Sequence, residues 1–188
     1  MSIDAKMTMA DSCNASVARN GGHEETLSIN GHYKVQCHDV NGDLKWEDEI
    51  HNIVTTVGKN VALTGTLTNA AQGAVYMGLK GTGTAVVGDT QASHGSWLEV
   101  GAANAPTYTS PRKTVTFAAA SGGSISSTGT YAFAILTSGT VAGCFINIAG
   151  SSVIDNTTGT LFSAGDFSSA KTVSASDTLT VTYTASIA

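Results

Sequence analysis

The stretch Asp89–Val100, DTQASHGSWLEV, gathers the residue types of a hydrolase site around one tryptophan. It supplies a possible base, two possible nucleophiles and two carboxylates: His94, Ser93, Ser96, Asp89 and Glu99. A nucleophilic serine needs a base at hydrogen-bond distance and an oxyanion hole, which a strand-to-helix turn such as G-x-S-x-G supplies. Here Trp97 and Leu98 follow the second serine and no helical pattern comes next. We therefore expect a turn with side chains bonded to the backbone, and Trp97 buried against a sheet.

A metal site could be sought among the histidines, cysteine and acids nearer the N-terminus: His23, Glu24, Glu25, His32, Cys37 and His38. Structural zinc sites use paired short spacings of Cys or His. Cys37 and His38 are adjacent, so on a strand they point to opposite faces. The HEE triplet lacks the second His of H-E-x-x-H. We expect Cys37 in a core, His38 in solvent, and no metal or other cofactor.

Phosphate binding and glycoside hydrolysis are indicated just as weakly by the sequence. The glycines of residues 78–88 match neither phosphate-binding fingerprint, and no helix follows them. Glycosidase carboxylates could be drawn from Asp89 with Glu99, or from residues 47–49. With 14 acidic residues in the chain, such pairs arise by chance. We expect no catalytic residues and a protein that is not an enzyme.

The composition indicates a structural β-protein. Charged residues make up 12% of the 188, about half the usual share, and Gly, Ala, Ser and Thr fill the deficit. Threonine favours strands, and a weakly charged surface packs closely against other subunits with few ions to desolvate. The net charge of −5 and the lack of a basic patch argue against nucleic acid as a partner. No apolar run reaches membrane length and no secretory core is visible, so we expect assembly in the cytoplasm, with three reduced cysteines.

Along the chain, residues 1–30 lack periodicity and are predicted to be an extended N-terminal arm. Residues 32–50 alternate apolar and polar side chains on both sides of Asn41-Gly42-Asp43, which predicts a β-hairpin. Helical spacing then predicts a short helix over 57–67, with Asn52 as a possible N-cap.

A sheet core is predicted over residues 75–188. Candidate strands are VYMGLKG, RKTVTFAAA, YAFAILT, TVAGCFINIAG and DTLTVTYTASI. In the last of these, Leu179, Val181 and Tyr183 alternate with threonines, so one face lies in a core. Turns about every ten residues are typical of a sandwich. The fold class predicted is all-β, mainly antiparallel: a β-sandwich or jelly-roll-like domain over 31–188 with one short helix.

Several segments, in this order, resemble a group of tailed-bacteriophage virion proteins. They are the hairpin with Trp46, NIVTTVGKNVAL, VYMGLKG, DTQASHGSWLEV, the strand start at Arg112, FAAASGGSIS, and TGTLFSAGDFSSAKTVSASDTLTVTY. The similarity covers most of residues 31–188 and excludes the arm.

The resemblance implies a non-enzymatic component of a phage particle. Such proteins occur as decoration or cement proteins on capsids, so the implied partners are the major capsid protein and further copies of this chain, as a dimer or trimer. Trp97 would be an anchor, His94 and Glu99 turn or interface groups, and Arg112 and Trp46 structural or interface residues. The alternatives are a tail-fibre, receptor-binding or tail-adaptor protein and, third, a virion-associated glycan hydrolase.

Overall fold

The computed structural model describes residues 28–109 and 111–188. The predicted arm therefore lies outside the described residues, apart from its last three positions. Strand β1 (Ile29–His38) begins at Ile29, so the final two residues assigned to the arm belong to the sheet. Ser28 and Ala188 exchange two backbone hydrogen bonds, which extend the ladder between the first and last strands.

The predicted hairpin is confirmed. Strand β1 pairs antiparallel with β2 (Leu44–Val54), and Cys37 lies opposite Trp46. In the turn, Gly42 has a φ of +89°, a conformation that glycine adopts without steric cost. The Asp39 carboxylate accepts hydrogen bonds from the backbone nitrogens of Asn41 and Asp43, which fixes the turn from its first residue.

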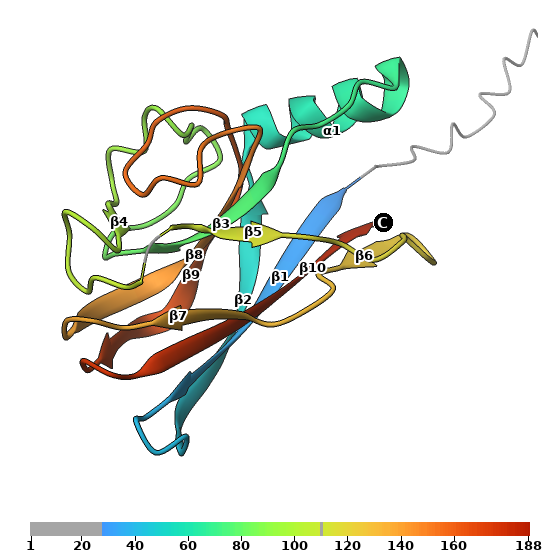
Figure 1. The fold of residues 1–188 in the computed structure, drawn as a ribbon. Helices are drawn as coiled ribbons and strands as arrows, with labels where there is room; N and C mark the ends of the chain where they lie inside the picture. The colour runs from blue at the N-terminus through green and yellow to red at the C-terminus, as the bar shows by residue number, and fades with distance from the viewer. Residues whose placement is uncertain (1–27, 110) are drawn as a thin grey trace, which may run out of the picture.

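The short helix is also confirmed, as α1 (Thr56–Thr68), but its predicted N-cap is wrong. The cap is Thr55, whose hydroxyl accepts a hydrogen bond from the Gly58 nitrogen at 3.0 Å. Asn52 lies within β2 instead, because that strand continues past the hairpin to Val54. Gly58 is the buried residue of the helix, and Leu67 is 79% exposed, so α1 projects from the sheet rather than packing along its length (Figure 1).

The remaining strands are β3 (Val75–Lys80), β4 (Glu99–Val100), β5 (Lys113–Val115), β6 (Ser124–Ser126), β7 (Tyr131–Ala134), β8 (Gly139–Ile148), β9 (Thr160–Val173) and β10 (Thr178–Ile187). All pairings are antiparallel, in the order β4-β3-β8-β9-β2-β1-β10-β6, with β5 on β3 and β7 on β10. The predicted all-β class is thus confirmed. The sheet curls so that its two halves face each other, and β2 joins them (Figure 1).

The core lies between these halves. The β1–β10 half contributes alternate residues such as Val35 and Val181, as the sequence pattern predicted. Met77 of β3 and Ile146 of β8 belong to the same buried cluster from the other half. The threonines of β10 point outward and are half-exposed. This outer face of β1 and β10 is covered by no described segment, and we call it the bare face.

Strand β9, the longest at 14 residues, was missed from the sequence. Its segment TLFSAGDFSSAKTV is rich in Gly, Ser and Ala, which are typical of turns. Here the small residues permit close packing. A Cβ at Gly165 would lie 2.5 Å from Ile50 of β2, so glycine is needed where β9 packs closely against that strand.

The outer face of β3, β8 and β9 is covered by irregular chain. Residues 81–109, apart from the two-residue strand β4 within them, and residues 149–159 lie side by side on this half of the sheet (Figure 1), and we call both segments the loop layer. A second buried cluster forms between the loop layer and the sheet from Ala85, Trp97, Phe145, Leu161 and Ala164. In the described part of the chain, no helix is long and apolar enough to cross a membrane.

Candidate functional site

Trp97 anchors the loop layer to the sheet. Its side chain is 2% exposed and its ring packs against Phe145 of β8, with centroids 5.6 Å apart. The indole Nε1 donates a hydrogen bond of 2.9 Å to Asp89, which also accepts one from the Val86 nitrogen. The expected burial of Trp97 against the sheet is confirmed, and Asp89 serves as its buried acceptor.

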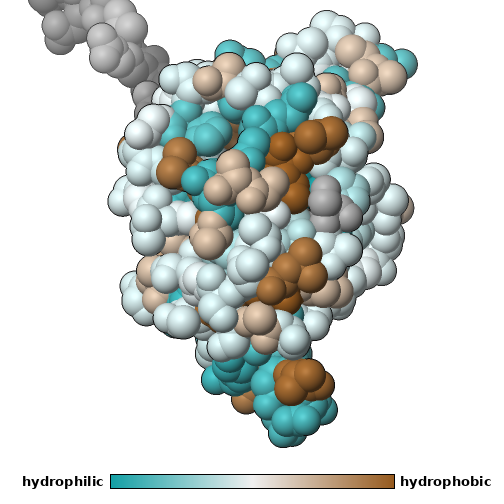
Figure 2. All heavy atoms as spheres, turned by 60° about the vertical axis from the view of Figure 1, so that its left-hand side comes forward, coloured by the Kyte–Doolittle hydropathy of each residue, from teal (hydrophilic) through white to brown (hydrophobic). Residues whose placement is uncertain are grey.

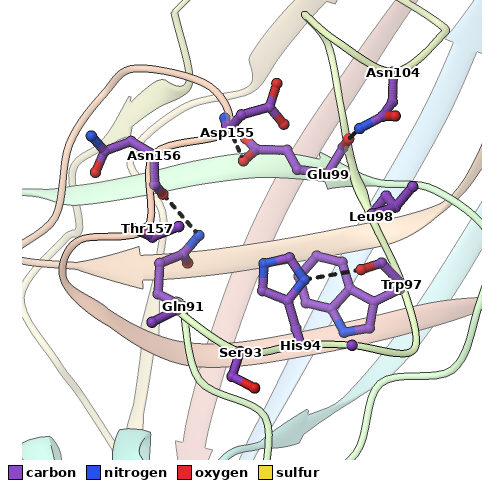
Figure 3. Close-up of a pocket in the computed structure, with 12 residues that line it drawn as sticks. Gln91, Ser93, His94, Trp97, Leu98, Glu99, Asn104, Asp155, Asn156 and Thr157 are labelled. Carbon is purple, nitrogen blue, oxygen red and sulfur yellow. Dashed lines mark hydrogen bonds between the residues drawn. The ribbon is translucent and has the colours of Figure 1, made fainter.

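His94 lies flat on Trp97, with ring centroids 4.0 Å apart and planes inclined by 18° (Figure 3). Its Nδ1 lies 3.0 Å from the Trp97 carbonyl oxygen. A carbonyl can only accept, so Nδ1 donates, and Nε2 is left as an acceptor in the neutral ring. Ser96 donates to the Thr84 carbonyl instead. Among the described residues, no serine hydrogen-bonds to His94, so the types that suggest a hydrolase are used for turn bonds.

Glu99 and Arg112 form a buried ion pair, with side chains 3% and 0% exposed. The guanidinium binds both carboxylate oxygens, Nε to Oε1 at 2.8 Å and Nη2 to Oε2 at 2.6 Å. Burial raises the pKa of Glu99, whereas the hydrogen bonds and charge of Arg112 lower it. Glu99 lies in β4 rather than in a turn, and its carboxylate is turned inward; its expected role at an interface stays a prediction.

This pair holds two parts of the loop layer together. Arg112 also donates to the carbonyls of Ser151 and Asn156, at 3.0 and 2.8 Å. Glu99 in turn accepts a bond of 2.9 Å from the Asp155 nitrogen. Asp155 has a φ of +62°, in the left-handed region that aspartate tolerates better than most residues. Removing either charge would therefore release segments some fifty residues apart in sequence.

A pocket of about 360 Å³, lined by both polar and apolar groups, opens in the loop layer (Figure 3). Residues from both parts of the layer line it: Gln91, His94, Leu98, Asn104, Asp155 and Thr157. Gln91, which is buried, donates to the Asn156 carbonyl at 3.3 Å and accepts from Asn147 of β8 at 2.8 Å. The pocket thus rests on the sheet through a hydrogen-bonded floor, and it is a candidate for ligand binding.

The carboxylates considered for glycoside hydrolysis are already bound within the protein. Asp89 is bound to Trp97, and both oxygens of Glu99 are bound to Arg112. In the other group, Asp48 forms an ion pair of 3.0 Å with Lys171 of β9. Neither set leaves two free carboxylates facing each other across a cleft.

The histidines and cysteine considered as metal ligands are separated. His32 lies 3.4 Å from Glu49 on the bare face, whereas Cys37 points into the core. Cys37 lies 3.7 Å from Asp177, and burial with this carboxylate raises its pKa to about 11. Within residues 28–109 and 111–188, no three His, Cys, Asp or Glu side chains are grouped to hold an ion. His23, Glu24 and Glu25 lie outside the described residues.

Trp46 stands apart from the loop layer. It lies on β2 and packs edge-on against Phe167 of β9, with ring centroids 5.6 Å apart. The structure thus brings together Trp97, His94, Glu99 and Arg112 but not Trp46. Asn104, Asp155 and Thr157 were missed. One signal pointed to the site: Glu99 is a charged residue placed between two apolar residues, Leu98 and Val100, in a weakly charged chain.

Comparison with protein-family models, with curated proteins and with solved structures found no match for this chain.

Proposed function

We propose that this protein is a non-enzymatic structural component of a phage virion, a decoration or cement protein that binds the outer surface of the major capsid protein shell. The resemblance of its segments to virion proteins supports this assignment. The observation that carries it is the arrangement of charge: within the described residues, most Lys, Arg, Asp and Glu side chains are paired with one another, which favours uncharged surface for assembly.

Four ion pairs have at least one largely buried member: Lys45–Asp177, Lys80–Asp166, Arg112–Glu99 and Lys171–Asp48. Much of the face seen in Figure 2 is accordingly pale, the colour of residues of intermediate hydropathy such as Ser, Thr and Gly. The tip of the β1–β2 hairpin, at the bottom, is the main projecting hydrophilic region. Uncharged surface docks with a small desolvation cost, which suits a protein that must cover many equivalent sites.

Binding to a capsid needs modest area for each contact. About 800 Å² on each partner is enough for a stable interface, and many copies on a shell add avidity. The bare face could contribute to such a contact through the threonines of β10; beside them, Lys34 of β1 is paired with Glu47 and Glu49 of β2. Contacts with further copies, as a dimer or trimer on a symmetry axis, would add area without a new type of surface.

The test is to locate the protein on intact particles of the phage that encodes it, with gold-labelled antibody and with quantitative mass spectrometry of copy number. We expect label over the whole shell and a copy number close to that of the major capsid protein. Particles that lack the protein altogether would refute a structural role in the virion.

A receptor-binding protein of the tail is the second candidate, and the loop-layer pocket favours it. A rigid pocket displayed by loops at one side of a β-domain is a common arrangement for ligand recognition. The same labelling experiment separates the two proposals: label confined to the tail, at tens of copies or fewer, would replace the decoration role with this one.

A further inference from the structure

We propose that the loop-layer pocket is a binding site for a neutral glycan, read through the hydroxyl groups of one or two sugar units. The inference does not depend on where the protein sits in a virion, because it rests on the pocket alone. Its volume of about 360 Å³ lies at the lower end of the range for small-ligand sites, and the pocket is open on one side. A terminal sugar could therefore enter while the rest of a glycan remains in solvent.

The wall of the pocket presents polar atoms that no hydrogen bond within the described residues uses. They are Nε2 of His94, the amide oxygen of Asn104, one carboxylate oxygen of Asp155 and the hydroxyl of Thr157. The other polar atoms of these residues are bound: Asn104 donates to the Glu99 carbonyl at 2.9 Å, and Asp155 accepts from the Ala103 nitrogen at 3.2 Å. His94, Asn104 and Asp155 are therefore each held by one hydrogen bond, with a second polar atom left to face a ligand.

These free groups are mainly acceptors, which suits a ligand rich in hydroxyl donors. Sugar hydroxyls donate as well as accept, so adjacent hydroxyls can bind a carboxylate and an amide together. The Asp155 carboxylate would make the strongest of these bonds, because an ionised acceptor roughly doubles the strength of a hydrogen bond.

The charges of the pocket exclude the main alternatives. Arg112, the one arginine in residues 28–109 and 111–188, is buried and bound to Glu99 and two carbonyls. Among the residues that the structure describes, no Lys or Arg lines the pocket, so phosphate, sulfate and carboxylate ligands would meet Asp155 without a compensating cation. No group of three metal ligands lies in the described residues, which leaves neutral polar molecules as the best match.

Leu98 and His94 add a flat, apolar side to the pocket. Leu98 is 61% exposed although it lies between two buried residues, Trp97 and Glu99. The His94 ring is stacked on Trp97 and so cannot rotate freely (Figure 3). Sugar rings have apolar faces of C–H groups, and an exposed leucine beside a fixed ring offers them a surface to cover.

The site is assembled before any ligand arrives. The Glu99–Arg112 pair fixes Asp155, and the Trp97–Asp89 bond fixes the segment that carries His94. A ligand would therefore bind without the cost of ordering loops, which is what a weakly binding single sugar requires. Burying an ion pair costs desolvation free energy, and here the buried pair holds the wall of the pocket in place.

The inference is tested with the isolated full-length protein. We would titrate ¹⁵N-labelled protein with the methyl glycosides of glucose, galactose, mannose and N-acetylglucosamine, and with methyl glucuronide as an anionic probe, and follow backbone amide shifts by NMR. We expect at least one neutral glycoside to shift amides of the loop layer in a saturable way. The anionic probe should bind about tenfold more weakly or not at all, for want of a cation.

Two variants test whether Asp155 and Asn104 hydrogen-bond the sugar. Asp155→Asn keeps a residue that tolerates the left-handed conformation, and Asn104→Ala removes a half-buried amide. Each should weaken binding about tenfold or more. Thr180→Ala, on the bare face, is the matched control and should bind as the parent does. Saturable shifts confined to other surfaces, or no shift with any of the five probes, would overturn the inference, as would unchanged affinity in both variants.

Discussion

The two outer faces of the curled sheet are built in opposite ways. The bare face of β1 and β10 carries half-exposed threonines in strict alternation with core residues. The opposite face, on β3, β8 and β9, supports the loop layer with a buried tryptophan and a buried ion pair. One half of the sheet thus has a single core side, whereas the other is buried on both sides, and this difference separates a plain structural surface from a surface able to recognise a ligand.

The two faces should differ in how much single side chains contribute to stability. On the bare face, outward side chains contact mainly water and one another, so each contributes little. In the loop layer, irregular chain must satisfy its backbone and polar groups through particular partners, and the loss of one leaves a buried charge or donor unpaired. Substitutions of similar size should therefore differ greatly in effect between the two faces.

The largest effect is expected for Arg112→Met. It leaves the Glu99 carboxylate buried without its partner and should lower the free energy of unfolding by about 3–5 kcal/mol. Chemical denaturation measures this directly. The double variant Arg112→Met/Glu99→Met should lose less than the sum of the two single losses, because the pair is then removed together. Additive losses would show that the pair does not act as a unit.

A smaller loss is expected for Trp97→Phe, which keeps an aromatic ring but removes the donor to Asp89. The buried acceptor would be left with the Val86 nitrogen alone, at a cost of about 1–3 kcal/mol. Asp89→Asn is the companion variant, since it keeps an acceptor for the indole and should cost less. Equal stability of Trp97→Phe and the parent would contradict a structural role for the indole bond.

Two buried thiols allow the interior beneath the bare face to be compared with the interior beneath the loop layer. Cys37 lies beneath the bare face and Cys144 beneath the loop layer; burial raises the pKa of both, that of Cys37 to about 11. The folded state therefore keeps these protons above about pH 8.5, where an unfolded thiol loses its own. The contribution of these thiols to the free energy of unfolding should be fully present below about pH 8.5 and should be lost as the pH rises toward 11. Denaturation at several pH values tests this, and Cys37→Ala should make the fall shallower.

Labelling with a thiol reagent at neutral pH gives a second reading of the same thiols. Neither Cys37 nor Cys144 should react in the folded protein, since both are fully buried. Rapid labelling of Cys37 alone would mean that the half of the sheet without a covering layer opens more easily than the other.

The smallest effect is expected for Thr180→Ala on the bare face. Its side chain lies half-exposed on β10 and donates only a long hydrogen bond of 3.4 Å to the Gln36 carbonyl. The change in unfolding free energy should stay within about 0.5 kcal/mol. A loss as large as that of Trp97→Phe would remove the distinction between the two faces.

The same contrast explains how much the sequence could predict. Alternation alone placed β10 and the hairpin of β1 and β2, because one face of each is buried and the other is not. Strand β9 was missed because Gly165 and its neighbours reflect packing against β2, which a local pattern does not contain. The N-cap was misplaced because β2 runs beyond the hairpin as far as Val54.

The site was partly predictable for a related reason. The burial of Trp97 followed from a large apolar side chain in a polar turn. The pairing of Glu99 with Arg112 did not, because Glu99 lies in β4 and Arg112 just before β5, and the two meet only when the chain folds. Asp155 comes from a segment more than fifty residues away, and nothing in its surroundings distinguishes it from an ordinary turn residue.

The central claim is that the loop layer is a fixed part of the fold, held by the Glu99–Arg112 pair. Native-state hydrogen exchange of individual amides tests it most directly. The Asp155 and Val86 amides, which bond to Glu99 and Asp89, should be protected to a degree similar to Val35 in β1. In Arg112→Met, the Asp155 amide should lose protection far more than Val35 does. Exchange of Asp155 and Val86 in the parent protein at the rate of an unstructured peptide would contradict the account.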